Sequence, residues 1–440
     1  MQMKQTFLFL TALCFLAYTN KAMAQSWSLN NGTLTVNDNT AFSTTPYPWV
    51  NNVNAVTKLV IGSGVTTVPN GVFNGCINLK TVTIADGTVT LVLSGSSGHF
   101  TNSPIETLYL GRDLDTGFYN DPNPFAENTS LKSVTVGNGV AAINGSSFYN
   151  CTGLQSLTMG SSLVSIGSSA FYGCSSLTGA LFIPQGVKTI GDAAFQGCRA
   201  LPSVTVPNSV NSIGNQAFNG CINLKTVTIA DGTVTLVLSG SSGHFTNSPI
   251  ETLYLGRDLV TGFYNDPNPF AENTSLKSVT IGQDVTTINS QSFYNCTGLS
   301  TVTSKNPNPP TTTNNNCFYD VYKTCKLYVP IGFLSKYNNA NQPEWKKFYD
   351  NSNMIEGSPT GIEDIVANQL KIYPNPNKSN IYIKSELPIK KVEIYSLTGA
   401  LLLFDNNFSE KISVSSLLKG TYLVKVYTDN GITVSKIVKE

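Results

Sequence analysis

The hydrophobic positions of the chain follow a pattern that repeats along most of its length. In the unit Gly186–Pro207, GVKTIGDAAFQGCRALPSVTVP, apolar residues lead up to a phenylalanine and continue in a Leu-x-x-Val-x-Val segment. This phenylalanine returns at intervals from 23 residues (Phe195 to Phe218) to 27 residues (Phe73 to Phe100), at Phe73, Phe100, Phe125, Phe148, Phe171, Phe195, Phe218, Phe245, Phe270, Phe293 and Phe318. A hydrophobic repeat of this period predicts a solenoid, whose coils pack only on their neighbours.

The Leu-x-x-Val-x-Val segments predict one short strand in each coil. They are found at Leu79–Ile84, Leu131–Val136, Leu154–Met159, Leu201–Val206 and Leu224–Ile229. Because side chains alternate along a strand, the valines and isoleucines point inward and their neighbours outward. We therefore expect a mainly β solenoid of about eleven coils with the phenylalanines in its core.

The segment from Leu370 to Glu440 has a different pattern. Its apolar residues alternate over short stretches that are separated by turn residues, at Ile381–Ile383, Lys391–Tyr395, Ala400–Phe404, Lys411–Val414, Tyr422–Tyr427 and Ile432–Val438. Short strands at this spacing predict a small Ig-like β-sandwich. The polar stretch before it reads as a linker, which we place at residues 351–368, between a solenoid at 61–350 and a C-terminal domain at 369–440.

The N-terminus has the pattern of a secretory signal peptide. Lys4 supplies a positive charge, Thr6–Tyr18 is a short apolar run, and Ala22-Met23-Ala24 is a small-x-small cleavage site. We expect residues 1–24 to be removed after Ala24, and residues 25–60 to lead into the solenoid. No other apolar stretch is long enough to span a bilayer, so we expect no transmembrane segment in the mature protein.

Composition supports a location outside the cell. Of 440 residues only 12% are charged, and the formal net charge is +1. No strong field attracts nucleic acid or an anionic membrane surface, so we expect no nucleic-acid partner. Thr, Ser, Asn and Gly fill the polar positions instead, which suits an extracellular β-rich protein.

Most of the nine cysteines belong to the repeat. Six of them follow a repeat phenylalanine by three positions, at Cys76, Cys151, Cys174, Cys198, Cys221 and Cys296. This spacing predicts small buried residues whose S–H groups donate to loop carbonyls. The chain has no Cys-x-x-Cys motif or Cys/His cluster, so we expect no metal site. Cys317 and Cys325 lie outside the pattern, and a disulfide between them is left open.

One part of the solenoid is duplicated almost without change. Residues 73–135 recur as 218–280, and the one difference is Asp115 against Val260. Whatever the first copy displays, the second displays again. The outward strand positions hold our ligand-binding candidates, Tyr109, Lys80 and Lys132 in the first copy and Tyr254, Lys225 and Lys277 in the second. The alternative is an ordinary solvated sheet face with surface tyrosines.

We find no catalytic constellation. The two histidines, His99 and His244, are the same position in the two copies, with no Asp and Ser at the spacing of a triad. Asp113 and Asp115 hint at a calcium loop, but Val260 removes one of the two carboxylates from the second copy. We therefore expect no cofactor and no enzyme, although paired carboxylates for glycoside hydrolysis are not ruled out.

The repeat frame G-V-x-x-I-G-x-x-A-F-x-G-C-x-x-L-x-x-V-x-[IV]-P resembles the BspA-like leucine-rich repeat family. It is seen best at Gly186–Pro207, and the segments Trp27–Val36 and Cys325–Pro330 resemble the ends of such arrays. The coils around Phe100, Phe125, Phe245 and Phe270 depart from the frame, because they lack the Gly-Cys pair. The resemblance implies a surface or secreted protein concerned with adhesion and host-protein binding.

The C-terminal segment resembles the type A sorting domain of the type IX secretion system. The resemblance rests on the motifs Val392–Gly399, Leu418–Val426 and Ser435–Lys439, and on the sorting-motif residues Tyr373, Pro374, Asn375, Pro376, Gly420 and Tyr422. It implies the type IX secretion machinery as a partner and places the protein outside a Gram-negative cell, secreted or on the outer-membrane surface.

Three functions follow from these patterns. We favour a secreted or cell-surface protein that binds a host protein or a glycan. The second is a structural spacer or coat component without a specific ligand. The third and weakest is a polymer-degrading enzyme.

Overall fold

The computed structural model describes residues 25–94, 99–100, 103–115, 123–240, 243–261, 269–313, 316–339, 341, 343–359, 371–373, 379–384, 388–396, 401–405, 411–428 and 431–440. The chain divides into two compact units. The first unit consists of the chain up to Leu327 together with Ser335–Met354. The second unit consists of Tyr328–Leu334 together with Ile355–Glu440. The predicted signal peptide lies outside the described residues.

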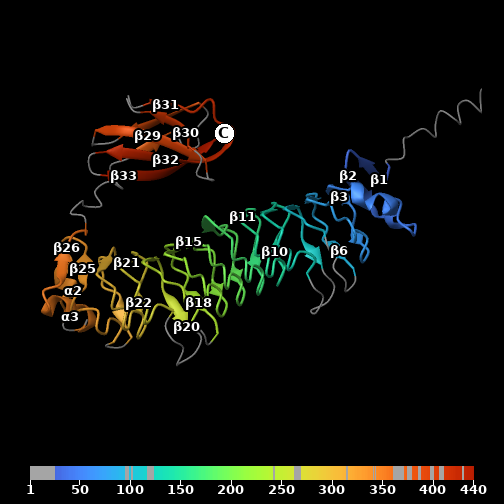
Figure 1. The fold of residues 1–440 in the computed structure, drawn as a ribbon. Helices are drawn as coiled ribbons and strands as arrows, with labels where there is room; N and C mark the ends of the chain where they lie inside the picture. Colours follow the sequence, from blue (N-terminus) through green and yellow to red (C-terminus); the bar gives the residue numbers. More distant parts are fainter. Residues whose placement is uncertain are drawn as a thin grey trace, which may run out of the picture. The chain divides into compact units, whose positions relative to one another are not determined.

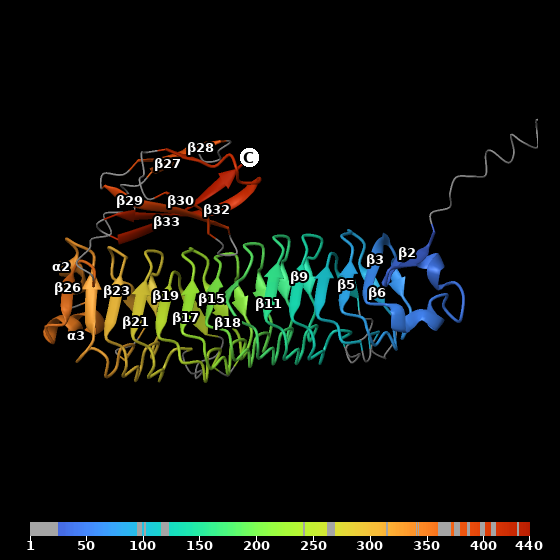
Figure 2. The same cartoon turned by 45° about the horizontal axis from the view of Figure 1, so that its top comes forward.

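The solenoid has a main row of strands, one from each coil, which Figure 2 shows side by side. A seven-stranded sheet has the order β1-β2-β3-β5-β7-β9-β11, with β1 (Trp27–Asn30), β2 (Thr33–Asp38), β3 (Lys58–Gly64), β5 (Thr81–Ile84), β7 (Thr107–Leu110), β9 (Ser133–Val136) and β11 (Ser156–Met159). An eight-stranded sheet has the order β13-β15-β17-β19-β21-β23-β25-β26, with β13 (Ala180–Phe182), β15 (Ser203–Val206), β17 (Thr226–Ile229), β19 (Thr252–Leu255), β21 (Ser278–Ile281), β23 (Thr301–Ser304), β25 (Lys326–Val329) and β26 (Met354–Glu356). Pairing is antiparallel between β1 and β2 and parallel from β2 to β11 and from β13 to β23.

A second row of shorter strands closes the other side of the coils (Figure 1). It consists of a sheet with the order β4-β6-β8, one with the order β10-β12-β14-β16-β18-β20, and the pair β22-β24. The strands are β4 (Thr67–Val68), β6 (Leu91–Leu93), β8 (Leu114–Asp115), β10 (Ala142–Ile143), β12 (Ser165–Ile166), β14 (Thr189–Ile190), β16 (Ser212–Ile213), β18 (Leu236–Leu238), β20 (Leu259–Thr261), β22 (Thr287–Ile288) and β24 (Thr311–Thr312).

A stack of aromatic rings forms the centre of the solenoid. All eleven repeat phenylalanines are buried. They stack in sequence order between Trp49 and Phe318, with neighbouring ring centroids 5.2–6.3 Å apart. This confirms the predicted solenoid, because each coil supplies one ring that only its two neighbours can cover.

A tryptophan covers each end of this stack. At the N-terminal end, Trp49 lies between the 3-10 helices η1 (Asn39–Phe42) and η2 (Val50–Ala55) and donates its N–H to the carbonyl of Val72 at 3.4 Å. At the other end, Trp345 on α3 (Pro343–Asp350), which follows α2 (Leu334–Tyr337), packs on Phe318 and donates to Pro310 at 2.7 Å. Because these N–H groups are bonded, the large rings can be buried without an unsatisfied donor. Among the described residues, no helix is long and apolar enough to cross a membrane.

The cysteines pack as predicted. Several donate from Sγ to the carbonyl of the phenylalanine one coil back, such as Cys151 to Phe125 at 3.0 Å and Cys221 to Phe195 at 3.3 Å. Ser248 occupies the same position in a coil without cysteine and donates to Phe218 at 2.8 Å. This coil, which departs from the repeat frame, therefore keeps a donor at the cysteine position.

Cys317 and Cys325 do not form the disulfide that the sequence left open. Both are buried, and neither is part of a disulfide. Cys317 Sγ lies 3.6 Å from the carbonyl of Ile288, and Cys325 Sγ lies 3.6 Å from that of Lys326. Each thiol thus has its own place in the packing.

The C-terminal unit contains a small antiparallel β-sandwich, as predicted. One sheet has the order β27-β28-β31, with β27 (Lys371–Tyr373), β28 (Asn380–Lys384) and β31 (Lys411–Ser413). The other has the order β30-β29-β32-β33, with β29 (Ile389–Ser396), β30 (Leu401–Asp405), β32 (Gly420–Thr428) and β33 (Gly431–Lys439). Its core joins residues of both sheets, among them Ile381, Ile383, Ile412, Val392, Ile394, Val424 and Val426.

Candidate functional site

The outward residues of the main strands form two columns along the solenoid. In β5, Val82 and Ile84 are buried, while Thr81 and Thr83 face outward. Parallel pairing places Thr83 beside Tyr109 of β7, and Tyr109 beside Thr135 of β9. The structure therefore puts both candidate tyrosines in a column of threonines, since Tyr254 has the same neighbours, Thr228 and Thr280, in the second copy.

Each candidate tyrosine is held by a carboxylate of the preceding coil. The Tyr109 hydroxyl donates to Asp86 Oδ1 at 2.7 Å, and the Tyr254 hydroxyl lies 2.8 Å from both carboxylate oxygens of Asp231. The bond to Asp86 raises the pKa of Tyr109, because the neutral phenol is the donor. Tyr109 is half-buried rather than fully exposed, so its ring presents one part of its surface to solvent.

A glycine of the following coil makes room for each hydroxyl. A Cβ atom on Gly137 would lie 2.6 Å from the Tyr109 hydroxyl oxygen, and one on Gly282 would lie 2.3 Å from Asp231 Oδ1. Any side chain at these glycines would displace the pair. The same Tyr–Asp–Gly arrangement is thus built twice from three consecutive coils.

The four candidate lysines do not occupy outward strand positions as predicted, because each of them lies one residue before its strand, where it forms an ion pair. Glu106 lies between Lys80 at 2.8 Å and Lys132 at 2.6 Å, each on a neighbouring coil. In the second copy, Glu251 pairs with Lys225 and Lys277. The bonds to Lys132 and Lys80 lower the pKa of Glu106 to about 2. Because these side chains are partly exposed, the pairs are screened by salt and contribute little stability.

Sequence reasoning missed the acidic partners. Asp86, Asp231, Glu106 and Glu251 lie inside the duplicated segments, but none of them is on an inward or outward strand position. Aligning the residue just before each strand would have put Glu106 between Lys80 and Lys132. Aligning the residues two positions after each strand would similarly have singled out Asp86.

Phe182 is another outward residue that sequence reasoning missed. It pairs with Thr205 in the strand register, and 65% of its side chain is exposed. Its neighbour Leu181 is buried, so Phe182 is not required for the core. Phe182 interrupts the repeat frame with an aromatic ring that the strand register places in one column with Tyr254, through Thr205 and Thr228.

A buried arginine ties together the coils behind each candidate tyrosine. Arg112 is fully buried and donates from Nη2 to Gly62 at 2.8 Å and from Nη1 to Ser63 at 3.1 Å. Arg257 donates to Pro207 at 2.9 Å and to Asn208 at 3.0 Å. Each arginine reaches two coils back along the chain, and burial lowers its pKa. These arginines support the face rather than lie on it.

Asp113, one of the two suspected calcium ligands, and its twin Asp258 accept hydrogen bonds from backbone N–H groups of the next coil. Asp113 Oδ1 accepts from the N–H groups of Ala141 and Ala142, at 2.8 and 3.0 Å, and Asp258 accepts from Thr286 and Thr287. Within the described ranges there is no group of three or more His, Cys, Asp or Glu side chains that could hold a metal ion.

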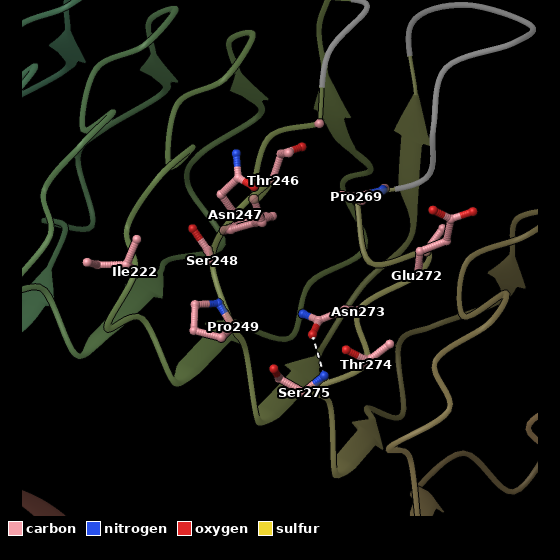
Figure 3. A pocket seen from close by; sticks show the side chains of 13 residues that line it. Ile222, Thr246, Asn247, Ser248, Pro249, Pro269, Glu272, Asn273, Thr274 and Ser275 are labelled. Atoms are coloured by element: carbon pink, nitrogen blue, oxygen red, sulfur yellow. Dashed lines mark hydrogen bonds between the residues drawn. The ribbon is translucent and has the colours of Figure 1, made fainter.

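A groove of about 690 Å³ lies beside Phe245 in the second copy (Figure 3). Its lining mixes polar residues, such as Thr246 and Asn273, with apolar ones, such as Ile222 and Pro249, and Glu272 is the one ionisable side chain among the described residues that line it. Ser248 is committed to its bond with Phe218. His244 is buried and bonds the carbonyl of Ser239 at 2.9 Å, so it has a structural role. Among the described residues that line it, the groove lacks a nucleophile with a base beside it.

The sorting-motif residues are described only in part. Ala24, Pro374, Asn375 and Pro376 lie outside the described residues. Tyr373 stacks on Tyr382 with the ring centroids 5.9 Å apart. Tyr422, in the strand that begins at Gly420, donates its hydroxyl to Leu418 at 2.7 Å.

Comparison with known proteins agrees with this architecture. The solenoid matches the BspA type leucine rich repeat region in six copies, over residues 50–178, 121–251 and 266–355. The chain belongs to this family. Residues 371–440 match the secretion system C-terminal sorting domain. The BspA-type chain is thus a leucine-rich repeat protein with a sorting domain, which implies the type IX machinery as a partner and secretion or attachment at the cell surface.

Several solved structures of bacterial leucine-rich repeat proteins are similar to this BspA-type chain. One from Eubacterium ventriosum is 19% identical, with a TM-score of 0.32, over 62% of this chain and 87% of that one. One from Bacteroides ovatus is 20% identical, with a TM-score of 0.32, over 69% and 85%. A leucine-rich cell surface protein from Faecalibacterium prausnitzii is 20% identical, with a TM-score of 0.19, over 64% and 94%. None of the curated proteins compared with the chain matches it.

Proposed function

We propose that this protein is an adhesin-like binding protein, displayed outside a Gram-negative cell, which holds an extracellular ligand on the outward face of its main strands. The observation that supports this most strongly is the Tyr–Asp–Gly arrangement, built in the same way in both copies. Core packing does not require it, because the hydroxyl, the carboxylate and the glycine all lie outside the buried ring stack.

The proposed organisation serves export. A signal peptide at 1–24 would start secretion, a segment at 25–60 and a solenoid at 61–350 would carry the binding face, and a linker at 351–368 would lead to the sorting domain at 369–440. The rival proposal is a spacer without a specific ligand. Ordinary polar residues along the face favour it, but the duplicated tyrosines have no role in it.

The two copies suit a repetitive ligand. Joining two weak sites on one rigid scaffold gains roughly 10²–10⁴ in overall affinity, provided that both sites reach the same partner. A bivalent site therefore binds long polymers or fibres much more tightly than it binds their single units.

Substitution of the two tyrosines tests this function. Tyr109→Ala and Tyr254→Ala, singly and together, would be compared for binding to immobilised matrix proteins and polysaccharides. We expect either single change to weaken binding to a polymer at least tenfold, and the pair to abolish it. Small and additive losses of affinity would contradict bivalent binding. Saturable binding that neither substitution affects would show that the ligand does not bind to this face.

A further inference from the structure

The exposed Phe182 stands midway between the two candidate tyrosines. Each coil contributes one phenylalanine to the ring stack, so the number of coils between two residues can be counted along the stack. Three steps lead from Phe100, in the coil of Tyr109, to Phe171, in the coil of Phe182. Three more lead to Phe245, in the coil of Tyr254. Phe182 therefore lies three coils from each candidate tyrosine.

This spacing is set by backbone geometry. Paired strands lie about 4.8 Å apart, so Phe182 and Tyr254, which three strand pairings join, lie roughly 14 Å apart. Because β11 and β13 belong to separate sheets, the step from Tyr109 to Phe182 follows the ring stack, whose three steps measure 5.3, 6.0 and 5.2 Å. Phe182 lies outside the duplicated segments. Its coil has one residue more than the repeat frame between the repeat phenylalanine and Leu181. Duplication accounts for the two tyrosines, but it does not place a third ring at the midpoint.

The positions between the rings carry hydroxyl groups. The outward residues of β9, β11, β15 and β17 are all threonine or serine, namely Ser133, Thr135, Ser156, Thr158, Ser203, Thr205, Thr226 and Thr228. No charged residue occupies an outward position of the described main-row strands from β5 to β21. Beside the face, Glu106 and Glu251 pair with the four candidate lysines. The ammonium group of Lys305 lies over the Tyr254 ring, 5.7 Å from its centroid.

We propose that the ligand is a neutral polysaccharide lying along the solenoid axis, across the strands. The rings of Tyr109, Phe182 and Tyr254 would pack against the C–H faces of its sugars, and the threonines and serines between them would exchange hydrogen bonds with its hydroxyl groups. This inference rests on the proposed function, because it requires the outward strand face to be the binding face.

The chemistry of the face disfavours other ligands. An anionic polymer gains its affinity from free cations, whereas the four candidate lysines already have carboxylate partners and Lys305 lies over the Tyr254 ring. A protein partner gains most from aromatic anchors clustered in a desolvated centre. Rings separated by rows of hydroxyl groups form no such centre. A hydroxylated chain that meets one ring at a time fits both observations.

The test replaces each ring by the residue found at the same position in neighbouring coils. Phe182→Thr, Tyr109→Thr and Tyr254→Thr would be made in the full chain, with Tyr319→Ala as control, because Tyr319 is an exposed aromatic residue that stacks on Tyr294 outside the main strands. Thermal unfolding would confirm that each variant is folded. The probes are soluble neutral glucans and mannans of graded length, a sulfated polysaccharide, and a fibrous matrix protein.

We expect a long neutral polysaccharide to bind at least tenfold more tightly than an oligosaccharide that reaches one ring. Phe182→Thr should remove most of that gain and lower the number of oligosaccharides bound from three to two, while Tyr319→Ala changes neither. Polysaccharide binding that is lost on tyrosine replacement but unchanged by Phe182→Thr would overturn the three-ring column and keep the proposed function.

Two other results distinguish failure of the ligand class from failure of the face. Tyrosine-dependent binding to the fibrous protein or the sulfated polysaccharide, without binding to neutral glycans, would overturn the polysaccharide while the proposed function stands. Absence of binding to every probe, or binding that none of the three replacements alters, would overturn both.

Discussion

At the residue scale, the solenoid depends on positions that each coil fills once. The Phe195 ring lies between Phe171 and Phe218, with ring centroids 5.2 and 5.4 Å away. Phe182, only thirteen positions earlier in sequence, lies on the outside. Phenylalanine is therefore a core residue at position 195 and a solvent-exposed residue at position 182.

Replacing Phe195 with alanine should cost about 3–5 kcal/mol of unfolding free energy, because the stack closes only partly over the lost ring. Urea denaturation would measure this. Phe182→Ala is the matched control and should change the unfolding free energy by less than about 0.5 kcal/mol, as is usual at exposed positions. Equal effects of the two changes would show that the ring stack does not carry the stability.

The buried thiols should make the fold sensitive to alkali. Burial raises the pKa of Cys151 and Cys221 to about 12 from the ordinary value of 9.0. When folding raises the pKa of a group, the group stabilises the folded protein fully at a pH below the pKa that it has in the unfolded chain. This stabilisation is lost as the pH rises toward the pKa that it has in the folded protein. We expect the melting temperature to fall between about pH 9 and 12, measured by circular dichroism.

The same thiols should resist alkylation at neutral pH until the chain unfolds, since thiolate is the reactive form. Mass spectrometry after iodoacetamide treatment, with and without denaturant, would check this. Rapid labelling of the native protein would contradict the packing of the cysteine column.

At the element scale, neighbouring coils are joined by more than strand pairing. Arg112 crosses two coil steps to reach the carbonyls of Gly62 and Ser63, and Arg257 does the same in the second copy. Hydrogen bonds from charged donors contribute more than neutral ones. The duplicated blocks thus carry their own clamp behind the tyrosine that they display.

Arg112→Ala should destabilise the protein by roughly 3 kcal/mol, because it removes two charge-assisted bonds and leaves a cavity. Chemical denaturation would measure the loss. Arg199, an exposed arginine of the same solenoid, offers the control, and Arg199→Ala should have an effect within about 0.5 kcal/mol. A neutral Arg112→Ala would mean that the cost of burying the guanidinium offsets its bonds.

At the scale of the whole molecule, the solenoid and the sorting domain are separate parts of the chain that match different families. The array offers a long face with repeated features, and residues 371–440 match a domain that directs export. A solenoid suits this arrangement, because each coil depends only on its neighbours and the strand face can vary without disturbing a distant site.

Truncation before Ile362 should retain the protein in the periplasm. Surface labelling and cell fractionation would show the full chain outside and the truncated chain inside. Full-length Tyr109→Ala is the control, since it alters the binding face but keeps the sorting domain. Surface display of the truncated chain at normal level would reject the sorting role.

The sequence alone determined the repeat, the main row of strands and the inward residues, but not the second row of shorter strands. Each follows from local alternation and from a period that depends on one coil at a time, so the repeat pattern was enough to assign Phe195 and Cys198 to the interior. The small sandwich and the duplicated tyrosines followed from equally local patterns.

Only the tertiary structure decided which residues meet between coils. The partners of Tyr109, Lys80 and Lys132 lie one coil away, more than twenty positions along the chain, and no local pattern connects them. Phe182 lies 73 residues after Tyr109 and 72 residues before Tyr254, but only the folded chain shows that its ring faces outward. Stacking converts intervals of 23 to 27 residues in sequence into ring-to-ring steps of 5.2 to 6.3 Å in space, and these steps set the spacing of the candidate binding face.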